Sequence, residues 1–157
     1  MASEELLSPH LSVGEFLATQ QRDLVAEQWR LWDGTPALQD AGRHFAKTVF
    51  EQVRAAVGTA LHVNSGYRCP PLNTLVGGVP TSRHMLALAA DVVPVGITLL
   101  EAMRRIADAT AAGQIPDLDK AIVECGVWIH VQGAPLGQVP RRQCLVTADT
   151  VHFQRFA

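Results

Sequence analysis

Two histidines and one aspartate are of the residue types that hold a catalytic metal. His84 and Asp91 belong to the run 82–91, and His130 lies in the apolar run 127–131. A catalytic zinc normally takes three protein nitrogen or oxygen ligands and leaves a fourth position for water, whereas a structural zinc is usually closed by four cysteine or histidine ligands. The three residues therefore predict an open zinc site.

The surroundings of these residues bear on that hypothesis. Asp91 ends the small apolar run 87–90, where a carboxylate is costly to bury without a cation or a hydrogen-bond partner. His130 occupies a strand-like segment, and the polar Gln132 follows on the same face of that strand. The alternative is that Asp91 caps a turn and that His130 is a core histidine with satisfied hydrogen bonds. Spacing alone leaves both interpretations open.

A resemblance that covers most of the chain favours the metal site. Segments 65–73 (SGYRCPPLN) and 76–84 (VGGVPTSRH), then Asp91, then segment 128–131 (WIHV), follow one another in the order and spacing of a known family. The chain resembles the M15 family of zinc D-Ala-D-Ala peptidases, and most of all the branch found in phage and prophage cell-wall enzymes. The resemblance implies Zn²⁺ held by His84, Asp91 and His130, and the stem peptides of bacterial peptidoglycan as substrate.

The family also implies a fold. We expect the α+β class, with a small antiparallel sheet and helices packed against it, as in the zinc D-Ala-D-Ala carboxypeptidases and Hedgehog-like proteins. Segments 11–16 and 141–145 resemble the N-terminal lead-in and the last strand of the phage branch. A length of 157 residues with 48% hydrophobic residues predicts a single domain. We divide it into a helical lead-in, 1–36, and a catalytic core, 37–157.

Several helices follow from local patterns. Hydrophobic residues recur at helical spacing from Leu38 to Ala56, and Gly58 follows as a stop signal. The segment from Ser12 to Trp32 predicts one or two shorter helices. A capping box that starts at Thr98 opens a further helix, which we expect to end at Gly113.

Glu124 is the candidate general base. Some relatives place the catalytic glutamate three residues before the last histidine, where this chain has Val127, whereas Glu124 matches the pattern of the phage branch. A two-residue loop between the flanking strands would turn Glu124 away from His130. We expect a three-residue loop, 125–127, with Gly126 in a left-handed bulge, which places Glu124 on the His130 face. The alternative is a hairpin glutamate that faces solvent.

Three further residues carry expectations taken from the family. The arginine that matches Arg68 faces the substrate, and a guanidinium binds a carboxylate through two parallel hydrogen bonds; a surface salt bridge is the alternative. Ser82 either binds substrate or caps a turn. Ala87 stands where the family has glycine. A methyl group there is tolerable if the backbone dihedrals are ordinary and costly if φ is positive.

Composition argues against other classes of partner. The net charge of −2 gives no basic surface for nucleic acid, and we interpret the pairs 104–105 and 141–142 as solvated arginines. The three cysteines have no CxxC spacing, so we expect reduced thiols. The sequence has no stretch long and apolar enough to span a membrane, which argues against a membrane partner. The remaining histidines, His10, His44, His62 and His152, are interpreted as surface or core residues.

We therefore expect zinc-dependent hydrolysis of a peptide bond in peptidoglycan stem peptides, by a D-Ala-D-Ala carboxypeptidase or an endopeptidase. Segment 1–7 is acidic and does not resemble a signal peptide. This predicts synthesis in the bacterial cytoplasm and action at the cell wall, after release at lysis or as part of a phage virion with tail or baseplate proteins as partners. The alternatives are a structural virion protein that keeps the peptidase fold, and a non-catalytic peptidoglycan-binding module.

Overall fold

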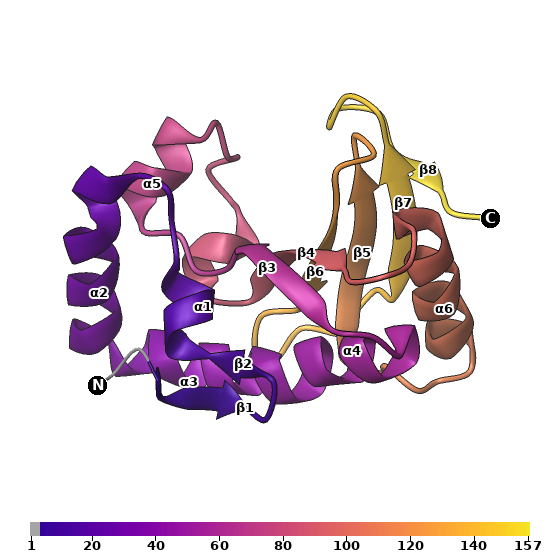
Figure 1. Cartoon of the computed structure of the whole chain (residues 1–157), viewed down its shortest axis with the longest axis horizontal. Helices are drawn as coiled ribbons and strands as arrows, with labels where there is room; N and C mark the ends of the chain where they lie inside the picture. The colour runs from indigo at the N-terminus through magenta and orange to yellow at the C-terminus, as the bar shows by residue number, and fades with distance from the viewer. Residues whose placement is uncertain (1–3) are drawn as a thin grey trace.

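Helical elements predominate in the first half of the chain and strands in the second half, and the helices pack around one large sheet (Figure 1). The computed structural model describes residues 4–157, so that residues 1–3 of the expected lead-in lie outside the described residues. The helical elements are α1 (Val13–Leu17), η2 (Arg22–Leu24), α2 (Val25–Gly34), α3 (Pro36–Phe45), η3 (Ala46–Phe50), α4 (Glu51–Val57), α5 (Pro70–Leu75), η4 (Arg83–Leu86) and α6 (Leu99–Ala111). The strands are β1 (Leu6–Ser8), β2 (Leu11–Ser12), β3 (Leu61–Ser65), β4 (Ala89–Pro94), β5 (Leu118–Glu124), β6 (Trp128–Gly133), β7 (Gln143–Thr147) and β8 (Gln154–Arg155). The expected α+β class is confirmed.

The large sheet has the strand order β3-β4-β6-β5-β7-β8. Every neighbouring pair is antiparallel except β5 and β7, which are parallel. The parallel pair arises because the end of β6 lies beside the start of β5. Segment 134–142 then leads the chain past this end of β5, so that β7 starts there and runs along the other side of β5 in the same direction. The expectation of an antiparallel sheet is therefore correct for all but this pair.

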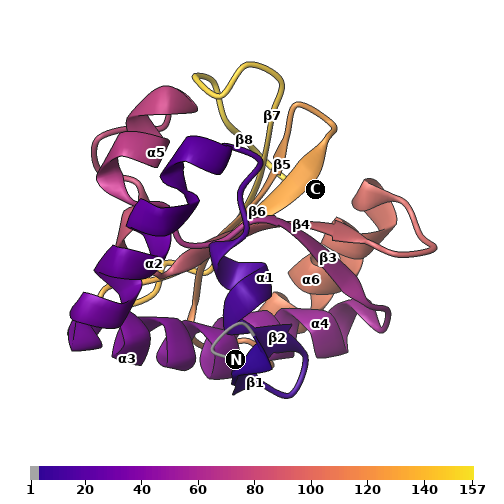
Figure 2. The same ribbon diagram turned by 60° about the vertical axis from the view of Figure 1, so that its left-hand side comes forward.

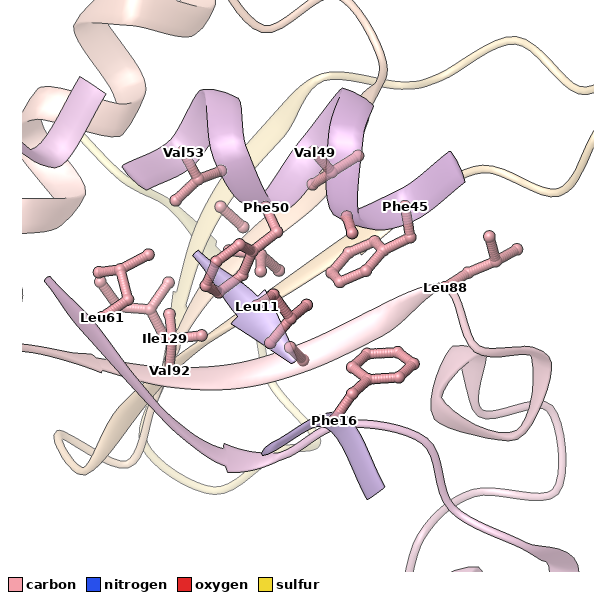
Figure 3. Close-up of a cluster of buried hydrophobic side chains, with 14 of the residues drawn as sticks. Leu11, Phe16, Phe45, Val49, Phe50, Val53, Leu61, Leu88, Val92 and Ile129 are labelled. Atoms are coloured by element: carbon pink, nitrogen blue, oxygen red, sulfur yellow. The ribbon is translucent and has the colours of Figure 1, made fainter. Parts of the chain in front are cut away.

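One long helical segment covers a face of the sheet. The helix expected from Leu38 to Ala56 is formed by α3, η3 and α4 in succession, with a π-helical turn in the middle and a left-handed Gly58 (φ 79°) at its end. Figure 3 shows its apolar side chains, among them Phe45 and Val53, against Val92 of β4 and Ile129 of β6. This layer forms the hydrophobic core and gives the sheet a rigid back.

The lead-in is part of that core. Ser12 and Glu15 form a capping box at the start of α1, which sequence reasoning had not identified. Phe16 in the same helix is fully buried and stacks on Phe45, with ring centroids 5.9 Å apart. Its carbonyl accepts a hydrogen bond from the backbone N–H of Tyr67 at 2.8 Å. In the view of Figure 2, α1 lies in front of the sheet near β3. The lead-in thus fixes the segment that follows β3.

Side chains that alternate along β4 and β6 place the core residues on one face of the sheet and the site residues on the other. In β4 and β6 the apolar residues Val92, Ile129 and Val131 belong to the hydrophobic core. Side chains of successive strand residues point to opposite faces, so Asp91 and His130 lie on the other face of the sheet. The helical segment α3-η3-α4 therefore covers one face of the sheet, and the polar side chains of Asp91 and His130 lie on the opposite face.

The free cysteines and the capped helix α6 agree with what the sequence predicts. The three cysteines are free, as predicted. Thr98 caps α6 by accepting a hydrogen bond from the backbone N–H of Glu101, and Gly113 follows the helix with a positive φ. Among the described residues, we find no helix with the length and apolar character needed to cross a membrane.

Gly66 provides a test of the contact between the lead-in and the sheet. A Cβ at this position would clash with the carbonyl oxygen and the ring of Phe16. Because Phe16 is held in the core, Gly66→Ala should lower the free energy of unfolding in urea by about 1–3 kcal/mol, the usual cost of overpacking. Gly34→Ala is the matched control, since nothing lies within 4 Å of its Cβ, and its free energy of unfolding should stay unchanged or rise. Equal effects of the two substitutions would contradict this account.

Candidate functional site

His84, Asp91 and His130 come together in the folded chain. One ligand atom from each lies within 4.8 Å of the others, and all three residues are buried, at 2%, 3% and 8% exposure. His84 belongs to η4, and Asp91 and His130 are directly paired residues of β4 and β6. The set predicted from sequence is thus assembled by two neighbouring strands and the turn that precedes one of them.

The ring of His84 is oriented by the backbone. Its Nδ1 lies 2.7 Å from the carbonyl oxygen of Gly66, which can only accept, so Nδ1 carries the proton. Nε2 is then free of a proton and lies 3.4 Å from Oδ1 of Asp91. Burial lowers the pKa of His84, against the opposing effect of Asp91. The neutral form, which is the form that binds a metal, is therefore favoured.

His130 approaches Asp91 through its other ring nitrogen. Nδ1 lies 3.0 Å from Oδ1 of Asp91, and Nε2 lies 2.8 Å from Oε1 of Gln132. Burial favours the neutral ring, but the hydrogen bond to Asp91 outweighs it and raises the pKa of His130. A metal at Nδ1 would take the place of the proton that this hydrogen bond shares, because metal binding to histidine releases protons.

Asp91 remains ionised although it is buried. Burial acts to raise its pKa, but the hydrogen bond from His130 prevails and holds the pKa below its ordinary value. Its second oxygen, Oδ2, accepts a hydrogen bond from Nη2 of Arg68 at 3.0 Å. Nε of Arg68 in turn donates to the hydroxyl of Ser65 at 3.0 Å. The predicted alternative of a surface salt bridge is wrong for Arg68, because its carboxylate partner is buried in the site.

A second layer of polar residues lies behind His130. Gln132 donates from Nε2 to Oδ2 of Asp119 at 2.7 Å. Asp119 also accepts hydrogen bonds from the backbone N, Nε and Nη2 of Arg141 at 3.0, 2.9 and 2.6 Å. Burial acts to raise the pKa of Asp119, but the hydrogen bonds from Arg141 outweigh it and lower the pKa. Arg141 is exposed, as interpreted from the sequence, but it is also the partner of a buried carboxylate, which the sequence did not predict.

The hairpin has the expected three-residue loop. Glu124 is paired with Trp128, and Gly126 has a positive φ of 67° as predicted; Cys125 shares that conformation with a φ of 53°. Glu124 therefore lies on the same face as His130. The structure gives its carboxylate a partner that the sequence did not, because Nε1 of Trp128 donates to Oε2 at 2.9 Å. Glu124 thus stands beside the three clustered residues rather than among them.

The comparisons with known proteins agree with this geometry. A family model described as Peptidase M15 matches residues 21–132. The chain belongs to the peptidase M15 family. The match includes the three clustered residues, together with Arg68 and Glu124. A comparison with curated proteins finds no match. The family is one of metal-dependent peptidases, and the cluster of this M15 chain has the donor atoms to hold a metal ion.

The turn that carries His84 in this M15 chain contains two of the residues singled out from sequence. The hydroxyl of Ser82 accepts a hydrogen bond from the backbone N–H of His84 at 3.2 Å, so Ser82 caps the turn; its role in substrate binding stays a prediction. Ala87 ends the turn in the left-handed region, with φ 57° and ψ 32°. The methyl group therefore occupies the position where it is costly, and the left-handed residue redirects the chain into β4.

A cleft of about 660 Å³ opens beside the cluster. It is lined by Arg68, Asp91 and Trp128 together with residues of β3 and of segment 18–21. Its volume is within the usual range for a small-molecule or short-peptide site. His62, which we interpreted from the sequence as a surface or core histidine, and Asn64 line this cleft. The signal that could have found them is their alternation with Leu61 and Val63 in a strand that leads directly to Arg68.

Ala87→Gly tests the strain in the turn. The substitution relieves a left-handed alanine, which costs roughly 1–2 kcal/mol, but loses one buried methyl group and adds freedom to the unfolded chain. These effects nearly cancel, so the free energy of unfolding in urea should change by less than about 1 kcal/mol. Ala102→Gly is the control, because Ala102 is equally buried but lies in α6 with helical geometry. It should cost about 2 kcal/mol, from lost helix propensity and the lost methyl group. A similar loss in both variants would refute strain at Ala87.

Proposed function

We propose that this M15 chain is a zinc peptidase of the phage or prophage type that hydrolyses a peptide bond in the stem peptides of bacterial peptidoglycan. The observation that carries the proposal is the buried cluster of His84, Asp91 and His130 beside a cleft, in a chain of the peptidase M15 family. We propose action at the cell wall, after release at lysis or as part of a virion in contact with tail or baseplate proteins.

The donor set fits zinc better than a hard cation. Two imidazoles and one carboxylate match the ligands of catalytic zinc sites, whereas magnesium and calcium prefer oxygen ligands alone. Both imidazoles have one nitrogen tied to a neighbouring acceptor and the other facing Asp91, which is the arrangement that orients histidine ligands. Zinc bound there would supply the Lewis acidity that polarises a peptide carbonyl and activates water for attack.

Two residues of the chain would act on the substrate. Arg68 borders the cleft and is held in place by Asp91 and Ser65, so its remaining N–H groups are available to a substrate carboxylate or carbonyl. Glu124 would accept the proton of the attacking water and pass it to the nitrogen of the leaving amine, which is the work of a general base that then acts as a general acid.

The other acids near the site are poorer candidates for the base. Both oxygens of Asp119 already accept hydrogen bonds from Arg141 and Gln132, which leaves no lone pair suited to take a proton from water. Asp117 lines a different cavity, together with His44 and Leu88. Glu124 has one oxygen bound to Trp128 and the other free of the hydrogen bonds found among the described residues.

Metal binding is the first prediction from this proposal. The full chain offered Zn²⁺ should retain about one equivalent, and His84→Ala or His130→Ala should lose most of it, because removal of one of three ligands leaves an incomplete site. His44→Ala, at an exposed position in α3, is the matched control and should retain the metal. Elemental analysis after gel filtration measures the occupancy. A folded wild-type protein without zinc would disprove the metal centre.

Hydrolysis is the second prediction. Purified muropeptides incubated with the zinc-loaded protein should show a cleaved stem peptide by mass spectrometry, and Glu124→Gln should reduce the rate by about a hundredfold or more with zinc occupancy unchanged. Glu101→Gln, at the exposed start of α6, is the control. Undiminished hydrolysis by Glu124→Gln would show that Glu124 is not the general base.

The same assay separates the two peptidase activities and the non-enzymatic alternative. Substrates that end in a free D-Ala carboxylate and the same peptides with an amidated end distinguish a carboxypeptidase, which needs the free end, from an endopeptidase. If the folded, zinc-loaded protein cuts neither kind of peptide, the structural virion protein is the better description.

A further inference from the structure

We infer that Arg141, Asp119 and Gln132 are positioning residues that present the Nδ1 lone pair of His130 to the metal. The inference rests on the proposed metal centre. A chain of hydrogen bonds runs from Arg141 through Asp119 and Gln132 to His130. The direction of each of these bonds decides which nitrogen of His130 carries a proton.

The direction of these hydrogen bonds is set by Arg141, the residue farthest from the metal ligands. A guanidinium only donates hydrogen bonds, so Arg141 makes both oxygens of Asp119 acceptors, Oδ1 at 2.9 Å from Nε and Oδ2 at 2.6 Å from Nη2. The backbone N–H of Arg141 adds a third donor at 3.0 Å. The remaining contact of Asp119, at 2.7 Å, must then come from the amide nitrogen of Gln132. The amide oxygen of Gln132 is therefore turned toward His130.

This orientation selects one tautomer of His130. An amide oxygen can only accept, so the contact of 2.8 Å between Oε1 of Gln132 and the ring requires the proton on Nε2. A neutral imidazole has one N–H, and its lone pair is then on Nδ1, the nitrogen that lies 3.0 Å from Asp91. His84 has the opposite assignment, because the carbonyl of Gly66 holds the proton on Nδ1. The two rings therefore offer different nitrogens to one ion.

Asp119 and Gln132 can fix the tautomer of His130 because both are buried. Asp119 is 2% exposed and Gln132 is 8% exposed, so bulk water does not readily replace either partner. Loss of an outer partner of a metal-binding histidine typically reduces metal affinity by about 10–100-fold. Arg141 lies outside residues 21–132, which match the family model, so the outer end of this chain of contacts is identified by the fold.

Asp119→Asn tests the direction without changing the shape of the side chain. The asparagine oxygen can accept from Nε of Arg141, and its amide group then presents N–H both to Nη2 of Arg141 and to the N–H of Gln132. Gln132 relieves this conflict by turning its amide, which puts an N–H opposite Nε2 of His130 and favours the wrong tautomer. In the zinc-loaded full chain, we expect the affinity for Zn²⁺ in a chelator competition to fall at least about tenfold.

A second substitution should reverse the loss. Gln132→Glu alone places a carboxylate against that of Asp119 and should also weaken zinc binding. In Asp119→Asn with Gln132→Glu, the new carboxylate accepts from both the asparagine N–H and Nε2 of His130, so that an acceptor again faces Nε2 of His130, although the hydrogen bond between positions 119 and 132 now runs in the opposite direction. The double variant should therefore bind zinc more tightly than either single variant, which is not expected if the three residues only fill space.

Nitrogen NMR of the zinc-loaded protein reads the tautomer directly. His130 should show a metal-bound Nδ1 and a protonated Nε2 in the wild type and the double variant. Asp149→Asn is the control, since Asp149 is also a hydrogen-bonded carboxylate but pairs with exposed His152; its zinc affinity should match the wild type.

Two outcomes would overturn the inference while the metal centre stands. One is an Asp119→Asn variant that is folded by circular dichroism and binds zinc as tightly as the wild type. The other is a zinc-loaded wild-type protein with the proton of His130 on Nδ1. A wild-type chain that takes up no zinc would instead overturn the proposed metal centre, and this inference with it, so the two failures are distinguishable.

Discussion

The buried negative charge of Asp91 is the constraint on which the site depends. An ionised carboxylate is costly to remove from water unless it is paired and hydrogen-bonded. Here the compensation comes from Arg68 on one oxygen and from His130 on the other. These partners come from the segment after β3 and from β6, so the charge can be buried only when both parts of the fold are in place beside β4.

The hydrophobic layer behind the sheet makes that convergence possible. The long helical segment α3-η3-α4 packs on one face of β4 and β6 (Figure 3), which leaves the other face for polar side chains. The lead-in, which packs into the same core, holds the segment after β3 through the contact between Phe16 and Gly66 and the hydrogen bond to Tyr67. The same Gly66 orients His84. Core packing and ligand orientation therefore share one stretch of backbone.

Local sequence was sufficient for several elements because short-range physics decides them. The helix from Leu38 to Ala56 follows from periodicity, and its end follows from Gly58. The three-residue loop after Glu124 follows from the preference of Gly126 for positive φ. The set of His84, Asp91 and His130 could be selected because these residue types suit one kind of metal site and because their order and spacing resemble a family.

Other features were decided only by tertiary structure, because they depend on residues far apart in the chain. The sequence showed that Ala87 replaces a glycine, but the positive φ at that position is set by the path from η4 into β4. The indole of Trp128 reaches Glu124 only after the hairpin has closed. Arg141 is exposed, as the sequence predicts, but its pairing with Asp119 depends on the tertiary structure, because the parallel pairing of β5 with β7 brings the two residues together. Composition and local spacing determine which chemistry is available, whereas the direction of each hydrogen bond depends on which donors and acceptors the folded chain places face to face.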